Sequence, residues 1–278
     1  MAGERSVLIT GCSTGIGHHA AHALAKRGWR VFATCRAEAD AARLTEEGLE
    51  SFVLDLADTA SIAAGADRVL EATDGKLYAL FNNGAYAQPG AVEDLPTDAL
   101  RAIFETNFFG WHELTRRILP AMRAQRRGRI VQNSSVLGFQ ALRFRGAYNS
   151  TKFALEGYSD TLRLELRGSG IHISLLEPGP IRTRIRENAQ AHYRRWIEPE
   201  KSFWAKLYAE QLEPRLFAVD PPKDPGELTC EATTAKVIHA LEAPRPRTHY
   251  PVTTPTWAMA ALKRTLPPRW VDAVAARH

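Results

Sequence analysis

Three glycines fall within seven residues near the start of the chain, directly after the apolar run "SVLI". The stretch "TGCSTGIGHHAAHA" (10–23) contains Gly11, Gly15 and Gly17, and a segment with helical spacing follows. Such a turn lets the backbone approach a phosphate closely, and the free N–H groups at the start of the helix face the anion. The spacing is G-x-x-x-G-x-G rather than the more common G-x-G-x-x-G. The stretch favours a phosphate-binding turn over a purely structural glycine turn, which stays open as the alternative.

Short apolar runs alternate with segments of helical spacing along the chain. The expected strands lie at 6–10, 30–34, 51–56, 77–83, 129–135, 171–178 and 248–253, and the expected helices at 15–28, 39–48, 60–73, 97–126 and 148–168. Continuous apolar strands separated by helices are typical of a parallel sheet that is covered on both faces. The pattern predicts an α/β fold with a doubly wound, seven-stranded parallel sheet, in one domain over residues 1–278.

One region, 181–226, carries no strand signal and is predicted to form a helical cap over the carboxyl edge of the sheet. Within it, "FWAKLYAEQL" (203–212) places five apolar residues on one helical stripe, namely Phe203, Trp204, Leu207, Tyr208 and Leu212. Together with the loop after residue 135, the cap is expected to supply apolar walls of a substrate pocket: Tyr193, Trp196, Phe203, Trp204, Leu207, Tyr208, Leu137, Phe139, Leu142 and Phe144. The alternative is that the stripe packs on the sheet or on another subunit.

The net charge of +5 is concentrated in a basic C-terminal segment at about 244–278. No basic motif interleaved with aromatic residues is present, so nucleic acid is not an expected partner, whereas a peripheral contact between this segment and a membrane stays open. Three widely spaced cysteines and the lack of a long apolar run predict reduced thiols and a cytoplasmic protein. No metal is expected, because His18, His19 and His22 lack an evident third ligand.

A second informative stretch is "SSVLGFQALRFRGAYNSTK" (134–152). Tyr148 and Lys152 are four residues apart and therefore share one face of a helix, while Ser135 is expected at the end of the preceding strand. A phenol normally loses its proton near pH 10, and a neighbouring ammonium lowers its pKa by favouring the phenolate. A tyrosine and a lysine at this spacing are a plausible acid–base pair. The pair becomes informative only beside the glycine-rich turn.

The two stretches occur together with further short motifs, and the order of these motifs along the chain is typical of one protein family. "TGCSTGIG", "NNGA" (82–85), Asn107, "SS" (134–135), "YNSTK" (148–152) and "PGPIRT" (178–183) resemble the short-chain dehydrogenase/reductase family over nearly the whole chain. The wording of "GCSTGIG", "VFATCR" and "STKFALEGYSDTLRLEL" is most similar to the branch of 17-beta-hydroxysteroid and retinol dehydrogenases. The sequence departs from the family at one point, since Gly84 and Ala85 stand where the family usually has Ala-Gly.

The resemblance implies a role for each catalytic position. Tyr148 would protonate the substrate oxygen during reduction, and Ser135 would donate a hydrogen bond to it. Lys152 would bind the nicotinamide ribose and lower the pKa of Tyr148, and Asn107 would hold a water that links Lys152 to solvent. The implied cofactor site consists of Gly11, Ser13, Thr14, Gly15, Ile16, Gly17, Arg36, Asp55, Leu56, Asn82, Gly84, Tyr148, Lys152, Pro178, Gly179, Ile181 and Thr183.

The end of the second strand predicts the choice of cofactor. A carboxylate there would bind the ribose hydroxyls of NAD, but this chain has Cys35 followed by Arg36. The guanidinium of Arg36 can form charge-assisted hydrogen bonds with a 2′-phosphate, and Ser13 is near enough to add a hydrogen bond from its hydroxyl. We therefore expect an NADP(H)-dependent oxidoreductase that interconverts an alcohol and a ketone or aldehyde on an apolar substrate. The resemblance further implies a homodimer or homotetramer. The alternative function is a non-catalytic NADP(H)-binding redox sensor.

Overall fold

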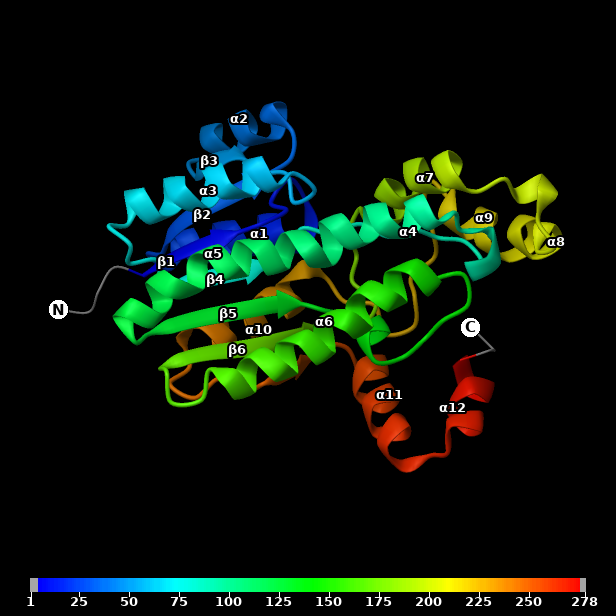
Figure 1. Cartoon of the computed structure of the whole chain (residues 1–278). Coiled ribbons are helices and arrows are strands. Elements are labelled where there is room, and N and C mark those ends of the chain that lie inside the picture. Colours follow the sequence, from blue (N-terminus) through cyan, green and yellow to red (C-terminus); the bar gives the residue numbers. More distant parts are fainter. Residues whose placement is uncertain (1–4, 276–278) are drawn as a thin grey trace.

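The computed structural model describes residues 5–275, which form a seven-stranded parallel sheet with helices on both faces (Figure 1). The ends of the predicted unit, residues 1–4 and 276–278, lie outside the described residues. The strand order is β3-β2-β1-β4-β5-β6-β7. The strands are β1 (Ser6–Ile9), β2 (Arg30–Cys35), β3 (Glu50–Val53), β4 (Ala79–Asn82), β5 (Gly128–Asn133), β6 (Ile171–Glu177) and β7 (His249–Pro251).

The direction of winding reverses between β1 and β4, where the chain has first built outward to β3 and then returns. In this pair Ile9 lies opposite Phe81. One face of the sheet is covered by α1 (Gly15–Lys26), α2 (Glu38–Glu46) and α10 (Cys230–Glu242), and the other by α3 (Thr59–Ala72), α5 (Gly110–Gln125) and α6 (Gly146–Glu165). Two separate apolar clusters result, one on each face. The predicted doubly wound sheet is confirmed, and a ligand is expected at the carboxyl edge where the winding reverses.

The segment 97–126 is not the single regular helix that its spacing predicts. It is divided into α4 (Thr97–Phe104), the π-helical segment η2 (Glu105–Phe109) and α5. Asn107 is buried inside η2, and its side chain bonds to the backbone of Tyr86. Such a π-helical widening of a helix is frequently found at functional sites.

The cap lies beyond the carboxyl ends of the strands, as Figure 1 shows. It consists of α7 (Ile185–Trp196), the 3-10 helix η4 (Pro199–Lys201), α8 (Ala205–Leu207), the π-helical segment η5 (Tyr208–Leu212) and α9 (Glu213–Leu216). Its helices share an apolar cluster of their own, which includes Ala91 and Phe144 from the loops below. The cap is therefore packed on the body of the protein through its own small core.

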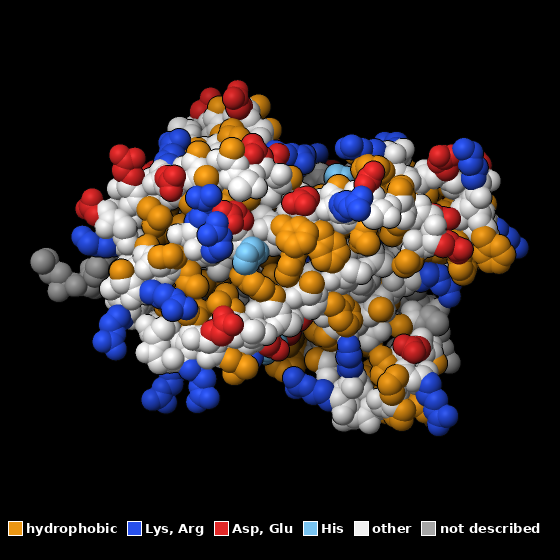
Figure 2. All heavy atoms as spheres, viewed as in Figure 1, with side chains coloured by type: hydrophobic (Ala, Val, Ile, Leu, Met, Phe, Trp, Pro, Cys, Tyr) orange, Lys and Arg blue, Asp and Glu red, His pale blue; other side chains and the backbone are white. Residues whose placement is uncertain are grey.

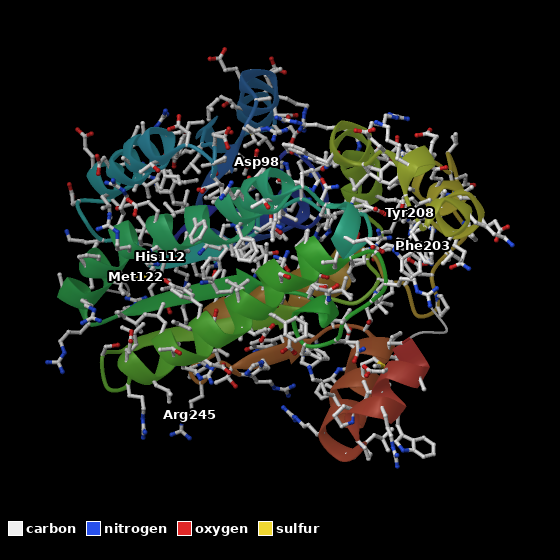
Figure 3. The ribbon with its side chains drawn as sticks, turned by 45° about the vertical axis from the view of Figure 1, so that its right-hand side comes forward. Asp98, His112, Met122, Phe203, Tyr208 and Arg245 are labelled. Carbon is white, nitrogen blue, oxygen red and sulfur yellow. The ribbon has the colours of Figure 1, made fainter. Side chains whose placement is uncertain are left out.

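The predicted apolar stripe is wrong at Phe203 and correct at Tyr208 and Leu212. Ser202 accepts a hydrogen bond from the backbone N–H of Trp204 and donates one to Asp94, so the chain turns here and α8 begins only at Ala205. Phe203 lies in this turn and is 86% exposed, whereas Tyr208 is completely buried. Figure 3 shows both residues at the cap.

The pocket walls expected from the cap need a similar correction. Tyr193 and Tyr208 are buried in the core of the cap, with their rings 6.0 Å apart and nearly perpendicular. Phe144, from the loop before α6, packs 5.1 Å from Tyr208. These residues hold the cap together. The expected wall residues that the structure leaves partly exposed are Trp196, Trp204, Leu207, Leu137, Phe139 and Leu142.

The basic C-terminal segment forms β7 followed by a pair of helices, α11 (Thr254–Thr265) and α12 (Pro268–Ala275), which project from the body of the protein (Figure 1). Among the described residues, no helix combines the length and the apolar character that crossing a bilayer requires. Cys12, Cys35 and Cys230 are all free thiols, as expected.

The anchoring of the cap leads to a prediction about stability. The Tyr208 hydroxyl accepts a hydrogen bond from the N–H of Ala91 at 2.7 Å and donates one to Asp94. Replacing Tyr208 by Phe leaves a buried N–H without an acceptor, which costs about 1–3 kcal/mol and lowers the melting temperature by about 2–4 °C per kcal/mol. Phe203→Ala, the matched control on the exposed side of the same cap, should change stability by less than about 0.5 kcal/mol. Calorimetric melting of both variants tests this, and equal melting temperatures would contradict it.

Candidate active site

The glycine-rich turn is held against the loop that follows β4. Gly11 and Gly15 have φ angles of +69° and +66°, in the left-handed region that favours glycine. A Cβ atom on Gly11 would lie 2.5 Å from the Cα atom of Gly84, and one on Gly17 would lie 2.4 Å from the carbonyl oxygen of Gly11. The backbone of the turn, the start of α1 and the loop after β4 are therefore packed too closely for any side chain at these positions.

A chain of amide side chains joins three strand ends at this place. The side-chain amide of Asn83 donates to the carbonyl oxygens of Thr10 and Gly11, at 2.9 and 3.1 Å. Asn133, the last residue of β5, donates to the side-chain oxygen of Asn83 at 2.8 Å. The sequence analysis missed Asn83 and Asn133 and named Asn82 instead. Asn82 is buried, and its side chain bonds to Thr115 and Gln132.

The residues expected to bind a pyrophosphate lie around the same turn. Thr183, from the loop after β6, places its methyl carbon 3.3 Å from the position that a Cβ atom on Gly15 would occupy. The side chain of Thr14 makes no capping hydrogen bond at the start of α1, so the first N–H groups of this helix stay available to an anion. Arg43 donates to the carbonyl oxygen of Ser13 at 2.7 Å and holds the turn from outside. The turn therefore fits the pyrophosphate of a dinucleotide.

The loop after β6 connects the turn to the strand that precedes α6. The carbonyl oxygen of Pro178 accepts a hydrogen bond from Val136 at 2.8 Å, and Ile181 pairs with Leu228 in an isolated bridge. Gly179 lies directly against Thr253 and Thr256, where a Cβ atom would not fit. The segment "PGPIRT" is thus fixed on both sides.

At the end of β2, Cys35 and Arg36 have different environments. Cys35 is 2% exposed, and burial raises the pKa of its thiol to about 11. Arg36 is exposed. Its positive charge favours a lower pKa for both Tyr86 and His192, whose rings stack with their centres 3.8 Å apart. Arg36 is therefore the exposed cation at this strand end. The contact between the loop after β4 and α7 was not visible in the sequence.

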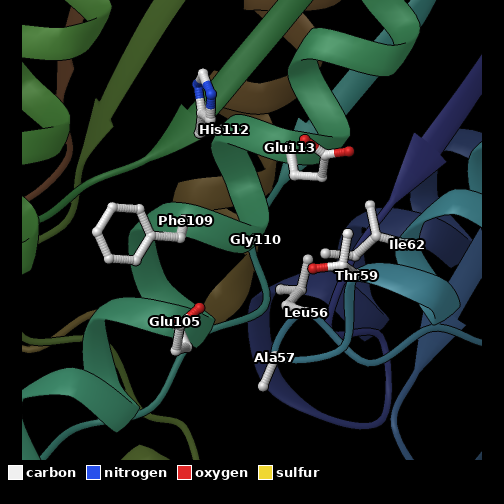
Figure 4. Close-up of a pocket in the computed structure, with 9 residues that line it drawn as sticks. All are labelled: Leu56, Ala57, Thr59, Ile62, Glu105, Phe109, Gly110, His112 and Glu113. Carbon is white, nitrogen blue, oxygen red and sulfur yellow. The ribbon is translucent and has the colours of Figure 1, made fainter.

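Leu56 and Asp55 follow β3 as expected. A carboxylate oxygen of Asp55 accepts a hydrogen bond from the N–H of Ala57 at 2.9 Å, which fixes the turn. Leu56 is buried next to Gly84 and Gly110. On its outer side, a groove between the start of α3 and the η2–α5 junction is lined by Leu56, Ala57, Thr59, Ile62, Glu105, Phe109, Gly110, His112 and Glu113 (Figure 4). None of Ser135, Tyr148 and Lys152 lines this groove, so it is separate from the predicted catalytic residues.

The structure brings Ser135, Tyr148 and Lys152 together at the carboxyl edge of β5. Tyr148 and Lys152 lie in the first two turns of α6, and Ser135 precedes the 3-10 helix η3 (Val136–Gly138). All three side chains are buried, and the hydroxyl of Ser135 accepts a hydrogen bond from the backbone N–H of Leu137 at 3.0 Å. The ammonium of Lys152 donates to the carbonyl oxygen of Asn133 at 2.7 Å and lies 4.3 Å from the ring centre of Trp111.

Burial dominates the acid–base properties of Tyr148 and Lys152 in this structure. Burial lowers the pKa of Lys152 to about 7, so this group changes its protonation near neutral pH. Burial raises the pKa of Tyr148 to about 12, and the group that opposes this rise is Ser135. Lys152 is not among the groups that shift the pKa of Tyr148 here, so its expected effect on Tyr148 stays a prediction. The ammonium is directed to Asn133 instead of the phenol oxygen.

Asn107 lies near these residues, but the oxygen and the nitrogen of its side-chain amide already form hydrogen bonds with another residue. Its amide oxygen accepts from the N–H of Tyr86 at 3.1 Å, and its amide nitrogen donates to the carbonyl oxygen of Tyr86 at 2.9 Å. Asn107 therefore fixes the loop after β4 by pairing with its backbone. No hydrogen bond joins its side chain to Lys152 among the contacts of the described residues.

A polar cluster next to the predicted catalytic residues was not expected from the sequence. Ser134 turns away from Tyr148 and donates to Glu156, one helical turn after Lys152. His249 of β7 hydrogen-bonds Glu177 at 2.8 Å and lies 3.9 Å from Glu156. Burial raises the pKa of Glu156 to about 7. Residues so far apart in the sequence give no signal of their association.

The environment of Tyr148 toward the cap is apolar. It clusters with Ile103 and Ala147, and the partly buried residues packed against this cluster are Tyr86, Ala87, Leu95, Phe104 and Leu137. A hydroxyl group in such a place is suited to a substrate whose reacting oxygen is attached to an apolar body.

The chain is similar in sequence to known dehydrogenases and oxidoreductases over most of its length. Residues 5–194 match the family model for short chain dehydrogenases. The chain is 40% identical over 276 residues to the uncharacterized oxidoreductase YbbO of Escherichia coli (strain K12), covering 98% of this chain and 94% of that protein. It is 39% identical to 17-beta-hydroxysteroid dehydrogenase type 6 of Rattus norvegicus and 34% identical to retinol dehydrogenase 16 of Homo sapiens, each over 89% of this chain and 80% of the relative.

A solved structure shows the same fold. The short chain dehydrogenase/reductase from Burkholderia phymatum in complex with NAD superposes with a TM-score of 0.78 at 25% identity, over 94% of this chain and 92% of that chain.

Proposed function

Because the chain belongs to the short chain dehydrogenase family and is similar to its hydroxysteroid and retinol dehydrogenases, we propose that it interconverts an alcohol and a ketone or aldehyde on an apolar substrate with NADP(H). The chain is an oxidoreductase of the type that acts on CH–OH groups. The buried group of Ser135, Tyr148 and Lys152 beside the glycine-rich turn carries the proposal. The proposal treats the chain as a single domain whose substrate-binding part is the cap at about 181–226.

In the proposed reduction, the cofactor would supply the hydride and the protein would supply the proton. The bound nicotinamide supplies the hydride that reaches the carbonyl carbon. Tyr148 gives its phenolic proton to the carbonyl oxygen, and Ser135 donates a hydrogen bond to the same oxygen, so the product is a neutral alcohol. Positioned proton transfer of this kind contributes about 10²–10⁴-fold to the rate.

Lys152 is proposed to bind the nicotinamide ribose and to restore the proton of Tyr148. Its pKa of about 7 suits a group that gives up and regains a proton at neutral pH. Asn107 belongs to this path through a water, as the family resemblance implies. Because its side chain is occupied by Tyr86, we assign the water to its backbone carbonyl.

The cofactor is proposed to be NADP(H) because the exposed residue at the end of β2 is Arg36. A guanidinium forms two parallel charge-assisted hydrogen bonds with a phosphate, whereas NAD offers only ribose hydroxyls at this place. The pyrophosphate would lie on Gly11, Thr14, Ile16 and the start of α1. The other proposed contacts are Ser13, Gly15, Gly17, Asp55, Leu56, Asn82, Gly84, Pro178, Gly179, Ile181 and Thr183.

The proposed quaternary structure is a homodimer or homotetramer that pairs through α5 and α6. Figure 2 shows hydrophobic side chains gathered over these helices. Phe109, Phe153 and Leu164 are 48%, 40% and 64% exposed, which is unusual for large apolar residues on neighbouring helices.

The helices α11 and α12 are proposed to touch a membrane surface. They expose Trp257 and Trp270 together with the cations Arg264 and Arg269. Aromatic rings and basic side chains are the groups that favour the headgroup region of a membrane. This contact is independent of the catalytic proposal.

The first test concerns the proton donor. Tyr148→Phe removes the hydroxyl and keeps the ring in its apolar cluster, so the variant should bind NADPH normally and lose at least about 100-fold in kcat. Steady-state kinetics and a fluorescence titration with NADPH measure the two quantities. Retained turnover with normal cofactor binding would rule out the assignment.

The second test concerns the cofactor. Arg36→Ala should weaken NADPH more than NADH, by a differential on the order of 1.5–3 kcal/mol, because the charge-assisted contact is lost for one cofactor only. Lys26→Ala is the control, since Lys26 is an exposed cation at the opposite end of α1. Titration of both cofactors into both variants gives the comparison. Equal affinity of the native protein for NADPH and NADH would show that the proposed preference is wrong.

The third test concerns the substrate. An apolar pocket gains roughly 25 cal/mol for each Å² removed from water, so kcat/KM should rise with each methylene in a series of aldehydes until the pocket is full. NADPH oxidation with aldehydes of increasing chain length, and with a steroid and a retinoid, measures this. A profile that does not change with chain length argues against an apolar substrate.

A further inference from the structure

Two histidines of α1 and one glutamate at the end of α2 meet on the surface of the protein. The Nε2 atoms of His18 and His22 lie 2.8 and 2.7 Å from the same carboxylate oxygen of Glu47. The two imidazoles are one helical turn apart, with ring centres separated by 4.6 Å. The three possible ligand atoms all lie within 4.8 Å of one another.

The sequence excluded a metal here because the histidines had no evident third ligand. Glu47 lies 25 residues after His22, in the turn that follows another helix, so spacing along the chain could not reveal it. The fold supplies the ligand that the local pattern lacks.

The carboxylate of Glu47 is held in place by the residue beside it. Arg43, one turn earlier in α2, donates to the other carboxylate oxygen at 2.6 Å and also donates to the carbonyl oxygen of Ser13. One carboxylate oxygen of Glu47 is thereby directed at the two imidazoles, while the other is bound by Arg43.

We propose that His18, His22 and Glu47 bind a divalent transition-metal ion of the zinc class, with water completing the coordination. Two imidazole nitrogens and a carboxylate oxygen are ligands that zinc accepts, and two histidines at positions i and i+4 of a helix present their nitrogens on one side.

Metal–ligand distances of about 2.0–2.2 Å place tetrahedral ligand atoms about 3.3–3.5 Å apart. The nitrogen–oxygen pairs in the structure need to separate by about 0.5–0.8 Å to reach this geometry. The three side chains are partly exposed, so rotation of these side chains provides the movement.

Bound metal would connect α1, which begins at the glycine-rich turn, to the end of α2. The hydrogen bond from Arg43 to Ser13 joins this site to the turn from outside. The ion would act as a structural connection, because its ligands lie outside the group of Ser135, Tyr148 and Lys152. Outer residues that orient a ligand, as Arg43 does, are a usual part of metal sites.

The experiment uses the full-length protein after treatment with a chelator, at pH 7.5. Zn²⁺ is titrated calorimetrically, and Co²⁺ is titrated while its visible absorption is recorded. The native protein should bind one equivalent, with cobalt bands typical of coordination by nitrogen and oxygen. His22→Gln and Glu47→Gln should each weaken zinc binding at least about tenfold, because each removes one ligand. His19→Gln is the matched control, since His19 lies on the same helix but contacts Thr234 and Glu231.

The proposal is overturned if the native protein binds no zinc, or if His19→Gln weakens binding as much as His22→Gln does. In that case the three residues form only a hydrogen-bonded group. Melting curves of the metal-free variants check that each is folded, and His18→Gln replaces any variant that is not. These measurements do not involve catalysis, so they stand apart from the test of the dehydrogenase activity.

Discussion

The close approach of Gly11 to Gly84 is the contact on which the site depends. A β-carbon on Gly11 would lie 2.5 Å from the backbone of Gly84, so the loops after β1 and β4 can meet only because neither residue has a side chain. Asn83 fills the remaining space and satisfies the carbonyl oxygens of Thr10 and Gly11. The reversed order of glycine and alanine at 84–85 is consistent with this packing, since the smaller residue stands at the point of contact.

The same series of hydrogen bonds continues to Lys152, the proposed catalytic lysine. Asn133 donates its side chain to Asn83 and offers its carbonyl oxygen to Lys152. An ammonium that is 1% exposed loses most of its hydration, and an unpaired buried charge costs several kcal/mol. The carbonyl oxygen of Asn133 and the ring face of Trp111 offset part of this cost. The part that is not offset lowers the pKa of Lys152. The position of α6 is thereby connected to the geometry of the glycine-rich turn.

The sequence predicted what depends on local pattern and spacing. The apolar strands, the glycine-rich turn and the pairing of Tyr148 with Lys152 follow from periodicity within a few residues, and the structure contains all of them. The failures involve contacts between distant segments. Phe203 matched the helical stripe, but the hydrogen bonds of Ser202 start the helix two residues later.

The pKa of Tyr148 likewise depends on the fold, namely on its burial and on where the ammonium of Lys152 points. Neither property can be read from the interval of four residues. Glu47, Glu156 and His249 show a further limit, since each joins its partners only through the fold. At the cap, Tyr86 shows how such contacts combine: its backbone is held by Asn107, and its ring stacks on His192 of α7 within reach of the charge of Arg36. Tyr86, a single residue of the loop after β4, therefore joins α7 of the cap to Asn107 of η2 and to the apolar cluster around Tyr148.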